Sequence, residues 1–282
     1  IRDRLEHHEE APSLKECLHL LATNRPLLML FLGNIFFVII KVSEQASFYF
    51  AYDALFNAKY NGFLDIAKAP GSFLAGIFVP IIIERLGRKA DSKKFYQVCC
   101  VMGIVLNGLF ALCTYNGIMN KGAGQSVSLL TGLMVIVFSA VVTFPLEFKN
   151  LMQKEMEAET VDYVEWKTGK RVEGTMLSIM SFTGKLEGTL SSFICLQVLA
   201  RTGYVEHTTD VSTLQNHSTL LGLFLMTTVF PMVGYALMLI PMHFYNITGD
   251  SHRRMIKDIM ARRAQAGEAA AQEAVAAEAK EG

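Results

Sequence analysis

The chain has 282 residues, of which 51% are hydrophobic and 18% are charged, and its mean hydropathy is +0.32. The charged fraction lies well below the roughly 25% of soluble domains, which indicates a membrane protein. The formal net charge is zero and gives no indication of a nucleic-acid partner. The five cysteines form no C-x-x-C pair, which excludes the usual zinc and disulfide frameworks. We therefore expect no metal site, no cofactor and no nucleic acid.

Six apolar segments are long enough to cross a membrane as helices, because about 20 residues at 1.5 Å each span the hydrocarbon core. None shows the alternation of a barrel strand. We therefore predict an all-α membrane protein with the lipid bilayer as its surroundings. The predicted spans lie near Pro26 to Phe50, Gly62 to Leu86, Phe95 to Tyr115, Ser126 to Leu146, Gly174 to Leu199 and Leu220 to Phe244.

Basic residues predict the orientation, because lysine and arginine near span ends stay on the cytoplasmic side. Twenty of the 26 lie before the first span, between Arg85 and Lys94, between Lys149 and Arg171, or after residue 245. The opposite loops hold only Lys59, Lys121 and Arg201. We expect a multi-pass protein of the plasma membrane with both termini cytoplasmic.

The predicted spans divide the chain into three parts. Residues 1–25 form a cytoplasmic segment in which SLKE, from Ser13 to Glu16, fits a capping box for a short amphipathic helix. Residues 26–244 form the six-helix bundle, and residues 245–282 form a low-complexity Ala/Glu tail for which we expect a solvated segment, helical or disordered. Because the sequence starts without methionine or a signal peptide, we expect a fragment or a processed chain.

Lys185 is the most informative polar residue, because a charge inside a span costs at least about 2.5 kcal/mol. It lies 11 residues beyond Gly174, hence roughly 16 Å into a core about 30 Å thick. At 100° per residue it shares one face of the helix with Gly174, Ser178, Ser181, Gly188, Thr189 and Ser192. This small and polar stripe predicts a watery cavity, with a structural ion pair as the alternative.

Other charged residues allow more than one interpretation. Glu187 points nearly opposite to Lys185 and is either protonated, paired to a neighbouring helix or closer to the membrane surface than the span boundary implies. Lys41 with Glu44, and Asp65 with Lys68, are spaced for ion pairs on single helices. Both pairs lie toward the outer ends of their spans, so interfacial ion pairs and substrate contacts both remain open.

The segment from Glu159 to Ser192, ETVDYVEWKTGKRVEGTMLSIMSFTGKLEGTLSS, carries a recognisable pattern. It resembles the signature of the glycoside, pentoside and hexuronide cation symporters, the melibiose permease family of the major facilitator superfamily. Its matching residues are Asp162, Tyr163, Glu165, Thr168, Gly169, Arg171, Glu173 and Lys185. The RLGRK loop at Arg85 to Lys89 and the opening SLKECLHLLATNRPLLML are similar to further parts of such carriers.

This resemblance implies one half of a twelve-helix carrier, the carboxyl half, whose partner is an amino-terminal six-helix half. It implies that Lys185, with Ser178 and Ser181 beside it, faces sugar and coupling cation. It also implies a cytoplasmic gate made of ion pairs. The gate residues would be Glu159, Asp162, Glu165, Lys167 and Arg171. The main site for the coupling ion, Na⁺ or H⁺, would lie in the absent amino half.

The function predicted from the sequence is symport of a sugar or glycoside with Na⁺ or H⁺ by alternating access. A truncated or non-transporting six-helix scaffold is the alternative. A polytopic membrane enzyme is less well supported, because His7-His8-Glu9-Glu10 lacks the spacing of a zinc protease and no G-x-S-x-G is present. We therefore expect a secondary active transporter and no enzyme.

Overall fold

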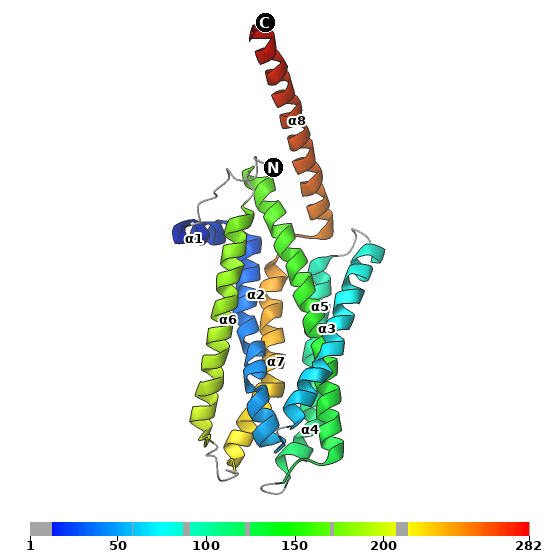
Figure 1. Ribbon diagram of the computed structural model, residues 1–282, viewed down its shortest axis with the longest axis vertical. Helices are drawn as coiled ribbons and strands as arrows, with labels where there is room; N and C mark the ends of the chain where they lie inside the picture. The colour runs from blue at the N-terminus through cyan, green and yellow to red at the C-terminus, as the bar shows by residue number, and fades with distance from the viewer. Residues whose placement is uncertain are drawn as a thin grey trace.

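The computed structural model describes residues 13–57, 59–86, 91–121, 125–169, 172–206 and 214–281, with the backbone alone for residues 14, 79, 82–86 and 266–281. All the regular structure in these residues is helical, which agrees with the predicted class (Figure 1). The helices are α1 (Leu14–Thr23), α2 (Arg25–Tyr49) with its π-helical extension η2 (Phe50–Ala54), α3 (Lys59–Leu86), α4 (Ser92–Met119), α5 (Leu129–Thr168), α6 (Glu173–Thr202), α7 (His217–Phe244) and α8 (Gly249–Glu281).

Helices α2 to α7 form an elongated bundle, and each of the six predicted spans lies on one of them, although α5 begins at Leu129, three residues after the predicted start at Ser126. Helix α2 packs against α7 and α6, whereas α5 packs against α4 and α3. Helices α1 and α8 lie at the same end of the bundle (Figure 1). Among the described residues, α2 with η2, α4, α5 and α7 are long and apolar enough to cross a membrane.

Capping side chains define where several helices begin. Ser13 accepts a hydrogen bond from the Glu16 amide while the Glu16 carboxylate accepts one from the Ser13 amide, as the sequence predicts. Asn24 and Asn216 accept bonds from amides in the first turns of α2 and α7. These caps satisfy donors that would otherwise lack partners at the helix ends.

The segment between the predicted spans that end near Leu146 and begin near Gly174 is mostly helical. Helix α5 has 40 residues and continues through Thr168. It ends at Gly169, whose φ of 73° is left-handed and favours glycine. A helix of this length is about 60 Å long and therefore extends well beyond a bilayer core of about 30 Å.

The carboxyl-terminal segment is helical from Gly249, and helix was one of the two forms expected for it. It forms α8, which rises from the bundle at the end where α1 lies (Figure 1). The first half of α8 packs against the extension of α5. Met255 and Ile259 are buried there, so α8 contributes apolar surface as well as charges.

Candidate functional site

Helix α6 has two distinct faces. Its packed face carries a stripe of buried side chains at helical spacing: Met176, Ile179, Thr183, Glu187, Ser191, Cys195 and Leu199. Lys185, Ser178 and Ser181 lie on the exposed remainder of the helix. The structure therefore confirms the predicted separation of Lys185 from Glu187, and it leaves the lysine uncovered by other helices of this chain.

Glu187 pairs with a neighbouring helix, which was one of the three interpretations of the sequence. Its carboxylate lies 3.1 Å from the Lys41 ammonium of α2, and its side chain is only 9% exposed. The expected pair of Lys41 with Glu44 within α2 is wrong, because Lys41 turns toward α6 instead. This contact compensates a carboxylate that burial would otherwise make costly.

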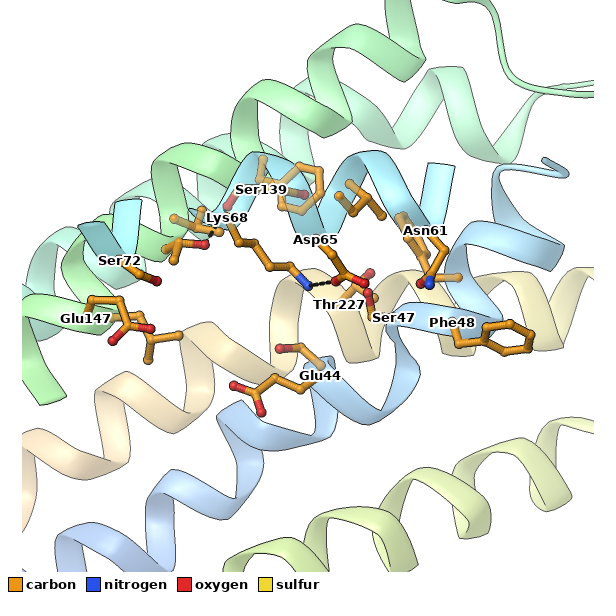
Figure 2. A pocket seen from close by; sticks show the side chains of 17 residues that line it. Glu44, Ser47, Phe48, Asn61, Asp65, Lys68, Ser72, Ser139, Glu147 and Thr227 are labelled. Atoms are coloured by element: carbon orange, nitrogen blue, oxygen red, sulfur yellow. Dashed lines mark hydrogen bonds and ion pairs between the residues drawn. The ribbon is translucent and has the colours of Figure 1, made fainter. Parts of the chain in front are cut away.

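A cavity of about 510 Å³ lies between α2, α3 and α5 (Figure 2). Its charged lining residues are Glu44, Asp65, Lys68 and Glu147. Hydroxyl and amide groups supply the other polar lining, from Ser43, Ser47, Asn61, Ser72, Ser139, Thr143 and Thr227. Phe48, Phe50 and Phe110 are among the apolar lining residues. The volume falls within the roughly 300–1,000 Å³ of small-molecule sites.

The predicted ion pair of Asp65 with Lys68 is present and lies inside this cavity. The two charged groups are 3.3 Å apart, and Figure 2 shows them near its middle. Glu44 and Glu147 lie to one side of the pair, and Asn61 and Phe48 lie to the other. Lys185 is not among the lining residues, so the structure does not bring it into the cavity.

A polar chain crosses the core between α5, α2 and α6. Fully buried Lys149 donates to Gln153 at 3.2 Å and stands over the ring of Phe37 at 3.8 Å. Gln153 donates to Asn34 at 2.7 Å, and Asn34 in turn approaches the Met180 sulfur at 3.7 Å. Asn34 therefore links helices in this structure, as its polarity within a span allows.

The predicted gate residues contact neighbouring parts of their own chain. Asp162 lies 3.0 Å from His252 of α8, and Glu165 accepts a bond from Arg263 Nε at 3.0 Å. Glu159 accepts a hydrogen bond from Ser92 at 2.7 Å. Exposed Lys167 lies 6.0 Å from the ring of Tyr163, whereas Arg171 lies outside the described residues.

The surroundings shift the pKa values of His252 and Tyr245 at the end of the bundle where α5 meets α8. The hydrogen bond to the Asp162 carboxylate raises the pKa of His252 above its ordinary value, against the opposing effect of burial. Burial raises the pKa of Tyr245 well above its ordinary value, and the Glu159 carboxylate adds to this. Tyr245 therefore stays neutral and donates to that carboxylate at 3.4 Å.

Sequence reasoning did not find the α2–α3–α5 cavity. A usable signal was present in α5, where Ser139, Thr143 and Glu147 recur every four residues through an otherwise apolar span. Among the described residues there is no group of three or more His, Cys, Asp or Glu side chains arranged to hold a metal ion. The cavity therefore offers hydrogen bonds and charge, and no feature of a metal centre.

Comparison with known proteins decides the family. A family model described as MFS/sugar transport protein matches residues 2–249, most of the chain. The chain belongs to this MFS/sugar transport family. Its members are membrane transporters, so the protein is related to carriers and not to enzymes.

Individual transporters are also similar to this chain in sequence, at low identity. The uncharacterized symporter YjmB of Bacillus subtilis is 25% identical over 256 residues, which cover 90% of this chain and 50% of that protein. A putative sulfoquinovose importer of Salmonella typhimurium is 27% identical over 75% of this chain and 40% of its own length. An isoprimeverose transporter of Lactiplantibacillus pentosus is 23% identical over 89% of this chain and 48% of its own length. The chain spans about half the length of these curated relatives.

Proposed function

We propose that this chain is the carboxyl half of a twelve-helix carrier that moves a sugar or glycoside together with Na⁺ or H⁺. The six helices α2 to α7, matched to about half of each relative, support this arrangement. The relatives named as an isoprimeverose transporter and a putative sulfoquinovose importer support a sugar as the substrate class. In this proposal the carrier lies in the plasma membrane, with both ends of the chain cytoplasmic.

The observation that carries the proposal is the exposed ammonium of Lys185 in the middle of α6. In the part of the chain that the structure describes, α6 is packed on the opposite face, and Lys185 is left exposed. A charge left in lipid at this depth costs at least about 2.5 kcal/mol. A water-filled passage shared with an amino half removes that cost, and Ser178 and Ser181 would line the same passage.

The cytoplasmic charges fit a gate in the same scheme. In this structure Asp162 and Glu165 are held by α8. During transport we expect them, together with Glu159, Lys167 and Arg171, to exchange some of these contacts for contacts with the amino half. Such an exchange shifts the populations of the two open states, which differ by only a few kcal/mol.

Uptake into vesicles tests the proposal directly. The chain would be produced together with an amino-terminal six-helix half and reconstituted, and uptake of radioactive Na⁺ and of protons would be followed while sugars are added. We expect at least one neutral or acidic glycoside to stimulate cation uptake. Vesicles without the amino half are the control. Well-inserted protein that shows no sugar-dependent cation uptake with any of the sugars would contradict symport.

A further inference from the structure

The α2–α3–α5 cavity is distinct from the Lys185 face and has a charge balance of its own. Its lining contains three carboxylates, of Glu44, Asp65 and Glu147, and one ammonium, of Lys68. The formal charge inside the cavity is therefore minus two. Seven hydroxyl and amide groups complete the polar lining, so the cavity offers many hydrogen bonds to an uncharged ligand.

The ammonium groups in and near the cavity already make ion pairs or hydrogen bonds within the protein. Lys68 is paired to Asp65 at 3.3 Å, and Lys41 behind the cavity is paired to Glu187 at 3.1 Å. Lys149, on the same helix as Glu147, is fully buried under the ring of Phe37 and donates to a glutamine. None of these ammonium groups is left to neutralise an anionic ligand without breaking a contact.

Two of the acidic groups of the cavity, in contrast, have no ion-pair partner among the described residues. In the part of the chain that the structure describes, Glu44 and Glu147 make no ion pair within 4 Å, although Lys41 and Lys68 lie near enough to attract Glu44. Figure 2 shows both carboxylates on the same side of the Asp65–Lys68 pair. A carboxylate accepts several hydrogen bonds, so this end of the cavity suits a ligand that donates them from hydroxyl groups.

We infer that the α2–α3–α5 cavity binds the hydroxyl-rich part of a neutral glycoside and excludes hexuronides and sulfonated sugars. The inference rests on the proposed sugar transport and narrows its substrate class. Hydroxyl groups of the ligand donate to Glu44 and Glu147, and the ring of Phe48 supplies an apolar surface on the other side of the Asp65–Lys68 pair (Figure 2). A carboxylate or sulfonate on the sugar meets the like charges of Glu44 and Glu147, and this repulsion disfavours acidic sugars.

Protection of an engineered cysteine measures this preference. Ser47 lines the cavity, so Ser47→Cys in the full chain in lipid nanodiscs would be labelled with a water-soluble thiol reagent. The probes are methyl glucoside and methyl xyloside, each compared with methyl glucuronide at equal concentration. We expect the neutral sugars to protect at least about tenfold better, a difference of about 1.4 kcal/mol. Lys59→Cys, outside the cavity lining, controls for changes in the reagent.

Charge removal separates electrostatics from shape. Glu44→Gln with Glu147→Gln keeps the size of both side chains and removes both negative charges, so protection by methyl glucuronide should rise by about tenfold. Glu157→Gln, which lies outside the cavity lining, is the matched control and should leave the preference unchanged. Equal protection by neutral and acidic sugars in the unmodified cavity would overturn the inference.

The two proposals fail in different ways. If the vesicle assay shows sugar-dependent cation uptake while no sugar protects Ser47→Cys, the cavity is not the binding site and only the inference is lost. If neither uptake nor protection is observed for any sugar, the proposed sugar transport is lost as well. Protection confined to neutral sugars, and relieved by the two glutamines, supports both.

Discussion

The charges inside the bundle and those at the end where α5 meets α8 are arranged by different rules. In the bundle, Glu187 is nearly buried and pairs with Lys41 on another helix. Where α5 meets α8, the contacts of Asp162 and Glu165 with α8 are partly open to water. Burial makes a lost partner costly, whereas water replaces a lost partner at the surface. Substitutions in the two regions should therefore differ in kind.

The largest effect should come from Lys185, which has the position of a buried charge but no covering helix. At an effective dielectric near 20, the Lys185 ammonium interacts with a second charge about 4 Å away by roughly 4 kcal/mol. Removal of the ammonium should therefore change the occupancy of a nearby ion site greatly. We expect Lys185→Ala to insert normally and to lose uphill sugar accumulation in vesicles. Lys185→Arg should retain at most part of it, since a planar guanidinium differs from a compact ammonium.

Two results would separate this role from a structural one. Low membrane yield of Lys185→Ala, with normal coupling in the protein that remains, would indicate that the lysine only stabilises the fold. Well-folded Lys185→Ala that still accumulates sugar against a gradient would remove the lysine from the mechanism.

The next effect should be on stability, at the pair of Lys41 and Glu187. Lys41→Met leaves a carboxylate with 9% of its side chain exposed without its partner. We expect a loss of about 1–3 kcal/mol in the free energy of unfolding, less than for fully buried pairs because Lys41 is partly exposed. Thermal unfolding in detergent would measure it.

Two further variants sharpen this comparison of regions. Lys41→Met with Glu187→Leu removes both charges and should recover most of the lost stability. Lys154→Met breaks a pair of the same 3.1 Å length, to Glu157, with a lysine side chain that is 72% exposed. It should cost less than about 1 kcal/mol. Equal losses in the Lys41 and Lys154 variants would contradict the contrast between the regions.

A smaller effect is expected at Asp162, on rate and not on binding. Asp162→Asn weakens the contact with His252 without removing any side chain that lines the cavity. We expect the rate of sugar transport to change several-fold while the affinity for sugar stays within about twofold, because the populations of the open states shift by about 1 kcal/mol. Initial uptake rates over a range of sugar concentrations measure both. Unchanged transport would indicate that these charges are only solvated.

The smallest effect should be a pH dependence of the contact between α5 and α8. The pKa of His252 is raised in the folded protein by Asp162, with Glu159 and Glu155 of the same helix adding to it. Its contribution is therefore fully present below about pH 6.5 and is lost as the pH rises through the raised pKa. We expect the protonated His252 to stabilise the contact between α5 and α8 by less than about 1 kcal/mol, as for other partly exposed ion pairs.

The single tryptophan provides the measurement. Trp166 donates a hydrogen bond of 2.9 Å to Asp258 on α8, so its fluorescence reports whether α8 is docked. The emission of the unmodified chain should change between pH 6 and pH 9, and that of His252→Gln should not. A similar change in both proteins would assign the titration to another group.

The sequence predicted well those features that depend on a single helix. Helical periodicity alone separated Lys185 from Glu187, because both lie on one helix and 100° per residue sets their directions. It did not identify Lys41 as the partner of Glu187, since a contact across 146 residues depends on how two helices pack. The predicted span ended near Leu146, because charged residues follow it. Those charges indicate only that the segment lies in water, and no proline or glycine lies between Leu146 and Gly169 to end the helix.

The cavity was beyond sequence reasoning for the same physical reason. Each of its walls lies on a separate helix, and the space depends on how α2, α3 and α5 pack around Glu44, Asp65 and Glu147. Periodicity gives the direction of a side chain from its own helix axis. It does not give the distance to the next helix.

Because α5 is long, a small bend near its middle displaces its far end by a large distance. Its cavity wall lies on both sides of Pro145, where the missing amide donor softens the helix. Glu165 lies 18 residues beyond Glu147, so about 27 Å of helix separates the cavity from the contact with Arg263. A bend of about 10° at the proline displaces the far end by roughly 5 Å over this length. A ligand of the cavity that straightens or bends α5 would therefore move α8 by more than the length of a hydrogen bond.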